Sequence, residues 1–251
     1  MAKIVKKNNH LESEYSSAKN DSKSNIVGFL TIFLISFACI FAYKEIDSPI
    51  FIIAAGILLI FGVISLQSGS KHAEEEKNIL ASGIVGENST ADLLSCLPDG
   101  YTVFQDVVVR YDGKVSEIDN IVVGNTGVFV IETKNHNGTI NGDYGEKDWL
   151  QSKVGRGGTP YYNSFYSPVK QVGTHIFRMK NMLKENGIHV YINGAVYFSN
   201  PQATVNISGD ETDIPVFAEF ESGGEDLLDY ILNGDANLSE PIVKRINKLL
   251  D

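Results

Sequence analysis

The chain has 251 residues, of which 43% are hydrophobic, and its formal net charge at pH 7 is −10. This length allows one ordinary domain with additional segments, and the apolar content excludes disorder over most of the chain. Residues 67–251 carry a net charge of −11, so they lack the basic stripe that is typical of nonspecific nucleic-acid binders. A metal site, which needs local negative charge, remains compatible with this composition.

Two apolar runs near the amino terminus, residues 25–43 and 49–67, contain no charged residue. An apolar helix of about 20 residues matches the hydrocarbon core of a bilayer, whereas a soluble helix would carry a polar stripe. Since only residues 44–48 separate the runs, we predict a hairpin of two transmembrane helices. Five lysines precede the first run and one lies between the runs, which predicts a multi-pass protein of the cell membrane with its amino terminus and its carboxyl-terminal domain in the cytoplasm.

The chain is therefore divided into a basic cytoplasmic tail (1–24), a transmembrane hairpin (25–67), a polar helical linker (68–82) and a folded domain (83–251). Within the domain, apolar periodicity and Gly/Pro boundaries predict helices and strands in an order typical of a mixed α/β sheet flanked by helices. Helices are expected at 79–97, 168–187, 224–234 and 238–250; strands at 101–110, 115–124, 127–134, 138–144, 148–152, 189–200 and 213–220. A glycine-rich loop is expected at 153–164.

The strands at 115–124 and 127–134 form a predicted hairpin whose turn is centred on Asn125-Thr126. Both of its faces are apolar, which is typical of central strands that are covered on both sides. We expect Ile121, Val123, Val128 and Val130 on one face, and Ile118, Val122, Phe129 and Ile131 on the other. The same register makes Val123 oppose Val128, Ile121 oppose Val130, Asp119 oppose Glu132, and Glu117 oppose Lys134.

Two carboxylates directly opposed in a hairpin lie close enough to repel, so they need a shared proton, a nearby cation or a bound metal. Mg²⁺ suits such a pair, because it is typically held by one or two carboxylates together with waters and phosphate. Lys134 lies two residues after Glu132 on the same face of the strand. The residues alone leave two interpretations open: a metal site, or a structural ion cluster at the end of the sheet.

From about residue 83 to about residue 202, the chain resembles the NERD family, the nuclease-related domain, whose fold is similar to that of the PD-(D/E)xK nucleases. The resemblance rests on "GIVGE" (83–87), "LPDGYTVFQDV" (97–107), "EIDNIVVGNTGVFVIETKNHNGTI" (117–140), Trp149, "SPVKQ" (167–171) and "VYFSNPQA" (196–203). Most relatives carry a histidine after the acidic Asp, where this chain has Asn120.

This resemblance implies a nuclease-like fold and roles for five residues. Asp119 and Glu132 would bind the divalent metal, Mg²⁺ or Mn²⁺, with help from the carbonyl of Thr133. Lys134 would orient or deprotonate the attacking water and stabilise charge on the phosphate. Glu87 would supply an auxiliary carboxylate, and Gln171 would position the phosphate or the water. Judged without the family, the preferred interpretation of Glu87 is a solvated residue on the helix surface, and that of Gln171 is an ordinary polar helix residue.

Other residues carry weaker signals. Lys153 and Arg156 in the glycine-rich loop are candidate contacts to a phosphate backbone, although a mobile surface loop is the simpler interpretation. Four aromatic residues near the loop are candidates for base stacking, with packing under the loop as the preferred interpretation: Tyr161, Tyr162, Phe165 and Tyr166. Trp149 is expected in the core. His136 and His175 lack metal-ligand spacing and are expected to be hydrogen-bonding residues.

Two hypotheses of different classes follow. The first is a membrane-anchored, metal-dependent nuclease that hydrolyses phosphodiester bonds of DNA or RNA on the cytoplasmic side. The second is a catalytically inactive, membrane-tethered module that binds a nucleic acid or a protein. The acidic charge of residues 67–251 favours the second, and the arrangement of Asp119, Glu132 and Lys134 favours the first.

Overall fold

The computed structural model describes residues 1–46, 49–155 and 157–251, and the side chains of these residues except 21–25, 44–46 and 66–72. The chain divides into two compact units: residues 10–84, and residues 1–9 together with 85–251. This division differs from the one expected from the sequence, because the first nine residues belong to the folded domain. Strand β1 (Lys3–Lys6) pairs in parallel with strand β2 (Thr102–Tyr111), which lies about 100 positions later in the chain.

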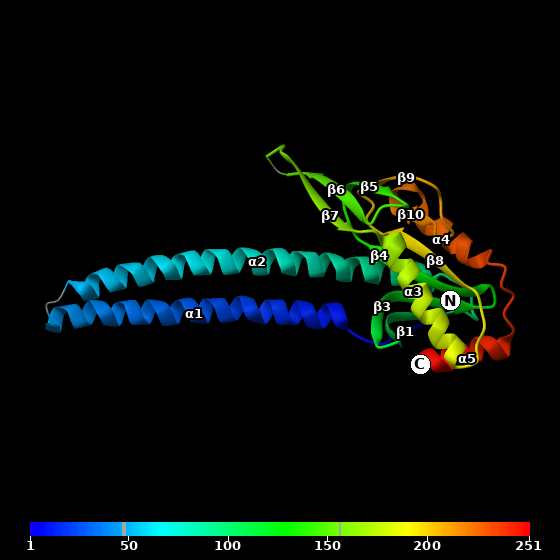
Figure 1. Ribbon diagram of the computed structural model, residues 1–251, viewed down its shortest axis with the longest axis horizontal. Coiled ribbons are helices and arrows are strands. Elements are labelled where there is room, and N and C mark those ends of the chain that lie inside the picture. The colour runs from blue at the N-terminus through cyan, green and yellow to red at the C-terminus, as the bar shows by residue number, and fades with distance from the viewer. Residues whose placement is uncertain (47–48, 156) are drawn as a thin grey trace. The chain divides into compact units, whose positions relative to one another are not determined.

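The unit of residues 10–84 is an antiparallel pair of long helices (Figure 1). Helix α1 covers His10–Ile46, and helix α2 covers Ile50–Ser95, so the expected polar linker is a continuous part of α2. Glycines on α2 allow the helices to approach closely. A Cβ atom at Gly62 would lie 3.1 Å from Cγ2 of Ile32, and one at Gly83 would lie 3.0 Å from Cδ1 of Leu11. Residues 47 and 48 of the predicted connection lie outside the described residues.

One segment of this unit, Ile26–Tyr43, is long and apolar enough to cross a membrane, and only 6% of it is buried. The apolar part of α2 within the described residues, Ile50–Ser65, is shorter. Of the two predicted spans, the first therefore meets the length requirement, and the second is not confirmed within the described residues. Large apolar side chains are nevertheless exposed along both helices, including Leu34, Phe37 and Phe41 on α1, and Ile53, Ile57 and Phe61 on α2.

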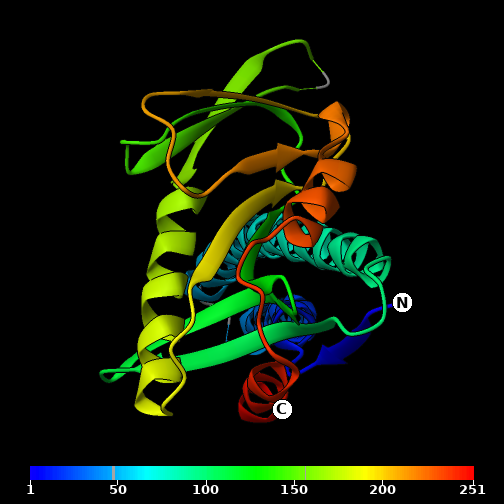
Figure 2. The same cartoon turned by 90° about the vertical axis from the view of Figure 1, so that its right-hand side faces the viewer.

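The domain is built on a six-stranded sheet with the order β1-β2-β3-β4-β8-β10 (Figure 2). Strands β2, β3 (Lys114–Gly124) and β4 (Gly127–Lys134) are antiparallel neighbours. Strands β8 (Ile192–Phe198) and β10 (Val216–Ala218) continue the sheet in parallel pairs. The predicted hairpin of β3 and β4 is therefore central, and both of its faces are covered.

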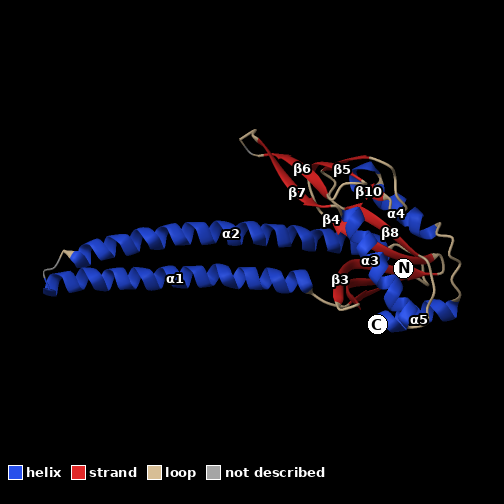
Figure 3. Cartoon of the chain, in the orientation of Figure 1, coloured by secondary structure: helices blue, strands red, loops and turns tan. Residues whose placement is uncertain are grey.

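A second, four-stranded sheet has the order β7-β6-β5-β9 (Figure 3). It contains β5 (Gly138–Asp143), β6 (Asp148–Val154), β7 (Pro160–Tyr166) and β9 (Ala203–Ser208). The prediction of a glycine-rich loop at 153–164 is wrong for most of its length. Pro160–Tyr166 is a strand that pairs antiparallel with β6. Strand β9 was also not expected. It pairs in parallel with β5, a partner about 65 residues earlier in the chain.

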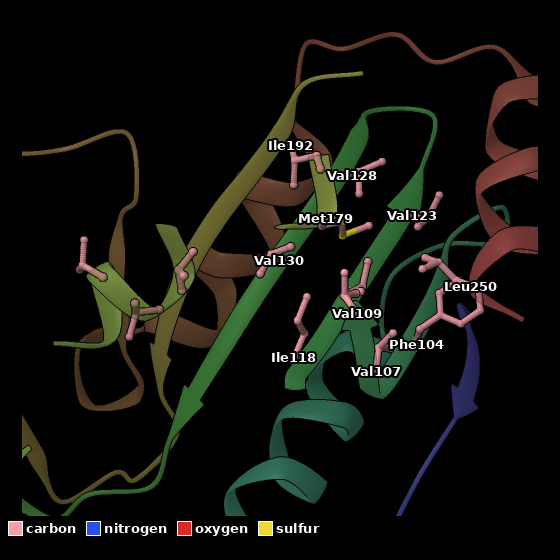
Figure 4. Packing of buried hydrophobic residues seen from close by; sticks show 14 of the residues in the cluster. Phe104, Val107, Val109, Ile118, Val123, Val128, Val130, Met179, Ile192 and Leu250 are labelled. Carbon is pink, nitrogen blue, oxygen red and sulfur yellow. The ribbon is translucent and has the colours of Figure 1, made fainter. Parts of the chain in front are cut away.

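Helices cover both faces of the six-stranded sheet. Helices α3 (Pro168–Glu185) and α5 (Glu240–Leu250) contribute to one apolar cluster, in which Met179 lies among Val123, Val128 and Val130 (Figure 4). The end of α2 and helix α4 (Gly223–Leu232) contribute to the other, and a short 3₁₀ turn, Glu219–Glu221, precedes α4. The mixed α/β sheet flanked by helices is therefore confirmed.

The alternation of β2 and β3 breaks at the level of Asp106 and Asp119. The ladder pairs Gln105 with Asn120 and Val107 with Ile118, and Asp106 between them has a left-handed φ of 53°. Ile118 therefore joins the cluster beneath α3, although regular alternation predicts it on the opposite face with Val122. This irregularity re-aims the side chains next to Asp119, as bulges do near functional sites.

Candidate active site

The candidate site lies where β3 and β4 separate. Their pairing follows the predicted register from Gly124 and Gly127 at the turn to Asn120 and Ile131, where it ends. Beyond this point, Oδ2 of Asp119 accepts a hydrogen bond of 2.7 Å from the backbone N–H of Thr133. The carboxylate thus replaces the missing ladder partner, which fixes it at the fork between the strands.

Two of the predicted cross-strand pairs are corrected by this fork. The ladder between β3 and β4 ends at Asn120 and Ile131, so it pairs neither Asp119 with Glu132 nor Glu117 with Lys134. Asp119 reaches β4 through its side chain instead. Sequence alternation could not reveal either change, because the strands diverge only in the folded sheet.

Glu132 and Lys134 form a buried ion pair at the end of β4. Glu132 is 2% exposed, and its Oε1 lies 2.6 Å from Nζ of Lys134. Nζ of Lys134 also donates to Oε1 of Gln171 on α3, at 3.2 Å. The spacing of two residues along the strand thus brings the ammonium against the carboxylate, as predicted, and Gln171 joins them from the covering helix.

The three charged groups shift one another's pKa values. Burial, followed by the charge of Glu132, raises the pKa of Asp119 well above its ordinary value, against the opposing effect of Lys134. Burial alone would raise the pKa of Glu132, but Lys134 and then His175 outweigh it, so the pKa is lowered. Burial would lower the pKa of Lys134, yet Glu132 and Asp119 outweigh it and raise the pKa. One negative charge is therefore matched by Lys134, while the second carboxylate retains its proton to a higher pH.

Helix α2 brings Glu87 toward this cluster. A Cβ atom at Gly86 would lie 2.6 Å from Cβ of Asn135, so only glycine allows the helix to approach the end of β4 this closely. Four residues later, Oγ1 of Thr90 accepts a hydrogen bond of 3.2 Å from Oγ1 of Thr133. Glu87 is half-buried, and its charge contributes to raising the pKa of Asp119.

Helix α3 adds a residue that the sequence analysis did not assign to the site. His175 is 5% exposed, and its Nε2 lies 3.4 Å from Oε2 of Glu132, which is an ion-pair distance without hydrogen-bond geometry. His175 follows Gln171 by four residues, so both side chains lie on one face of the helix. That spacing was the signal that could have identified it.

Of the two residues predicted to contact the substrate, the structure describes only Lys153. Lys153 lies on β6, half-buried and opposite Tyr161 of β7, whereas Arg156 lies outside the described residues. Burial, followed by the charges of Lys134 and Lys153, lowers the pKa of His136 to about 4. The charges of Lys153 and Lys134 thus both act on His136, which brings Lys153 into the electrostatic surroundings of the site.

The aromatic residues of β7 do not pack under a loop, contrary to the preferred interpretation. Tyr161, Tyr162 and Tyr166 are 46%, 63% and 43% exposed. Phe165 alone turns inward, where its ring contacts His136 edge-on with 4.5 Å between centroids. Trp149 is buried and stacks on Phe198, which confirms its place in the core.

The donor set fits a hard divalent cation. Among the side chains that the structure describes, no three His, Cys, Asp or Glu residues are grouped as metal ligands. Mg²⁺ commonly requires only one or two carboxylates, since waters complete its coordination. Oε2 of Glu132 is buried without a hydrogen-bond partner in the described part of the chain, and burial, followed by the charge of Glu132, raises the pKa of the Asp119 carboxyl, an effect that a bound cation would oppose.

Comparison with known proteins supports the resemblance on which these residues were chosen. Residues 82–199 match the NERD family, the nuclease-related domain, which confirms the predicted resemblance. An uncharacterized protein of Bacillus anthracis is 35% identical over 119 residues, which are 46% of this chain and 53% of that protein. The chain thus spans about half the length of this relative. No solved structure shows a significant match.

Proposed function

Because residues 82–199 match the nuclease-related domain, we propose that this domain is a metal-dependent phosphodiesterase that acts on nucleic acid. The observation that carries the proposal is the cluster of buried Glu132 with half-buried Asp119 and Lys134 at the fork between β3 and β4. Burial and the charge of Glu132 raise the pKa of Asp119 although Lys134 opposes them, so the two acids favour a further cation beside Lys134, which supports a metal site over a purely structural cluster.

Asp119 and Glu132 would hold Mg²⁺ or Mn²⁺, with Glu87 as an auxiliary carboxylate. When bound, such an ion supplies Lewis acidity and lowers the pKa of water. Lys134 would stabilise the negative charge that grows on the phosphate oxygens as water attacks phosphorus and the bond to one sugar oxygen breaks. Gln171 would hold the Lys134 ammonium in place, since the two side chains are already hydrogen-bonded.

The β6–β7 hairpin would bind the substrate strand. Its exposed face carries Tyr162 and Tyr166, and Lys153 lies on the same pair of strands. Stacking of a base on an aromatic side chain contributes about 1–3 kcal/mol and tolerates any sequence. This local surface would offset the acidic charge of the domain, and Lys153 and Arg156 would contact the phosphate backbone.

The helical hairpin would anchor the domain to a lipid bilayer, with α2 supplying the second span. The exposed apolar side chains of both helices favour this arrangement. Strand β1 gives a topological argument, because a strand that pairs with β2 must lie on the same side of the bilayer as the domain. The chain between them would then cross an even number of times, and the lysine bias favours the cytoplasm for both ends.

The test is cleavage of single- and double-stranded DNA and RNA by the full-length protein in detergent, with Mg²⁺ or Mn²⁺. We expect Glu132→Gln and Lys134→Met each to lower the rate by about 100-fold or more, the magnitude seen when one group that stabilises the transition state is removed. Glu240→Gln is a matched control, since Glu240 pairs with Lys244 on the surface. Cleavage that persists undiminished in both site variants contradicts the mechanism.

A catalytically inactive module that binds a nucleic acid or a protein is the second candidate. It is favoured by the 2.6 Å pair of Lys134 and Glu132, in which the lysine already neutralises one carboxylate. Calorimetric titration with Mn²⁺ separates the two candidates. Absence of binding at millimolar Mn²⁺, together with full function of Asp119→Asn, would favour the inactive module.

A further inference from the structure

His175 occupies a position on α3 where an apolar residue would ordinarily pack. The buried side of the helix is otherwise mainly apolar and includes Val172, Met179 and Leu183. A buried polar group without a hydrogen bond costs about 1–3 kcal/mol. Neither Nδ1 nor Nε2 of His175 has a hydrogen-bond partner within the described part of the chain. Packing alone therefore does not explain why a histidine occupies this position.

The surroundings of the imidazole indicate that reason. The Glu132 carboxylate has contacts on both sides: Oε1 lies 2.6 Å from Nζ of Lys134, and Oε2 lies 3.4 Å from Nε2 of His175. The terminal torsion of a glutamate is broad, so a contact at one oxygen alone leaves the plane of the carboxylate free to rotate. A second contact at Oε2 restricts this rotation.

Helix α3 contacts both members of the Glu132–Lys134 ion pair, each through a different side chain. Gln171 holds Lys134, and His175, one turn later, faces Glu132. Ser167 caps the amino terminus of the helix, because its Oγ accepts a hydrogen bond from the backbone N–H of Lys170. The cap fixes where the helix starts, and therefore which side chains face the site. The two side chains thus enter the site from a helix whose start is defined by a cap and a proline.

We propose that His175 is a positioning residue that orients the Glu132 carboxylate toward the divalent cation. The inference rests on the proposed function, since it presumes that Glu132 is a metal ligand. Partners of metal-ligating carboxylates change metal affinity by about 10–100-fold when they are removed. His175 acts through Glu132 and need not contact the substrate.

The experiment measures Mn²⁺ binding to the full-length protein in detergent by electron paramagnetic resonance of the free ion, which requires no catalysis. We expect His175→Leu to weaken Mn²⁺ binding by about 10–100-fold, and His175→Gln to restore most of it, because a glutamine amide can reach the position of Nε2. Met179→Leu is the matched control, as a conservative change on the same buried stripe. It should leave the dissociation constant unchanged.

A double variant separates positioning from folding. In the Glu132→Gln background, His175→Leu should cause no further loss of Mn²⁺ affinity, because the two residues act through one contact. If wild type binds Mn²⁺ and His175→Leu binds it equally well, this inference is overturned while the proposed function stands. If wild type binds no Mn²⁺ and cleaves no nucleic acid, the proposed function and the inference fail together.

Discussion

The two units of the chain use apolar side chains in opposite ways. In the domain, the residues of β4 from Gly127 to Glu132 are buried, because helices cover both faces of the sheet. In the helical unit, Ile26–Tyr43 is equally apolar, but only 6% of it is buried. The domain therefore buries its apolar surface internally, whereas the helical pair leaves most of its apolar surface exposed.

The contrast extends to charge. The domain holds the buried Glu132 and the half-buried Asp119 and Lys134 around a fork in its central hairpin, while the apolar segment Ile26–Tyr43 contains no charged side chain. Buried charges are retained in proteins only where partners or bound ions compensate them. Stability of the domain should consequently depend on individual charges, and behaviour of the helical unit should depend on its outer surface.

Introducing an aspartate into each unit should produce the largest difference between the two units. Val130→Asp places a charge in the fully buried centre of β4 and should unfold the domain, with a loss above about 4 kcal/mol. Leu34→Asp, on a side chain that is 67% exposed, should leave the domain folded and remove the chain from the membrane fraction. Urea denaturation and membrane fractionation measure the two effects. Retention of Leu34→Asp in membranes would contradict the proposed anchor.

Removing the buried ammonium should have the next largest effect. Lys134→Met leaves Glu132 buried beside only His175, so we expect a loss of about 3–5 kcal/mol in the free energy of unfolding. Lys19→Met, at an exposed position of α1, should change stability by less than about 0.5 kcal/mol. Equal effects of the two substitutions would show that the cluster contributes no special stability.

The amino-terminal strand offers a third way to sharpen the comparison, because it joins the domain although it precedes the helices. The backbone N–H groups of Lys3 and Lys7 donate to the carbonyls of Tyr101, just before β2, and Gln105 in β2, so alternation directs that of Val5 to β2 and that of Ile4 away. Val5→Pro should destabilise the domain by about 3 kcal/mol. Ile4→Pro, the matched control on the free edge, should cost clearly less. Thermal melting followed by circular dichroism measures both.

The pH dependence of stability should report the raised pKa of Asp119. In the unfolded chain this carboxyl titrates near 3.8, and in the folded protein its pKa is higher. Between these two pH values the folded protein binds more protons, so the free energy of unfolding falls as pH rises through this window. Metal-free Asp119→Asn should therefore be more stable than wild type at neutral pH.

Mn²⁺ provides the control for this effect. A bound cation compensates the second carboxylate, so added Mn²⁺ should raise the melting temperature of wild type but not that of Asp119→Asn. Asp92→Asn, an exposed carboxylate on α2, should match wild type in both conditions. A lower melting temperature of Asp119→Asn in the absence of metal would contradict the assigned direction of the shift.

Much of the site was predictable because its signals are local. The turn at Asn125-Thr126, the register of Val123 with Val128, and the helix that starts at Pro168 follow from short-range alternation, glycine and proline signals. The grouping of Asp119, Glu132 and Lys134 followed from the predicted register of the hairpin, and the family resemblance added Glu87 and Gln171; the structure brings these residues together. Their roles in catalysis and metal binding stay predictions.

The errors arose where distant segments decide local geometry. Tyr161 and Tyr162 were expected under a loop, but pairing with β6 turns that segment into a strand with an exposed face. Ile118 changed face because Asp106, on the neighbouring strand, adopts a left-handed backbone conformation. His175 was considered isolated because its partner, Glu132, lies 43 residues earlier and meets it only when α3 packs on the sheet.

The sequence by itself determined which segments are apolar, where most helices and central strands lie, and that two acids and a lysine occur at the ends of one hairpin. These properties depend on residues within a few positions of one another, so periodicity and turn chemistry suffice to read them. Only the tertiary structure decided that β1 joins the domain, that Asp119 closes the fork through its side chain, and that His175 faces Glu132. Such contacts depend on which strands become neighbours, and strand order is set by packing of the whole sheet.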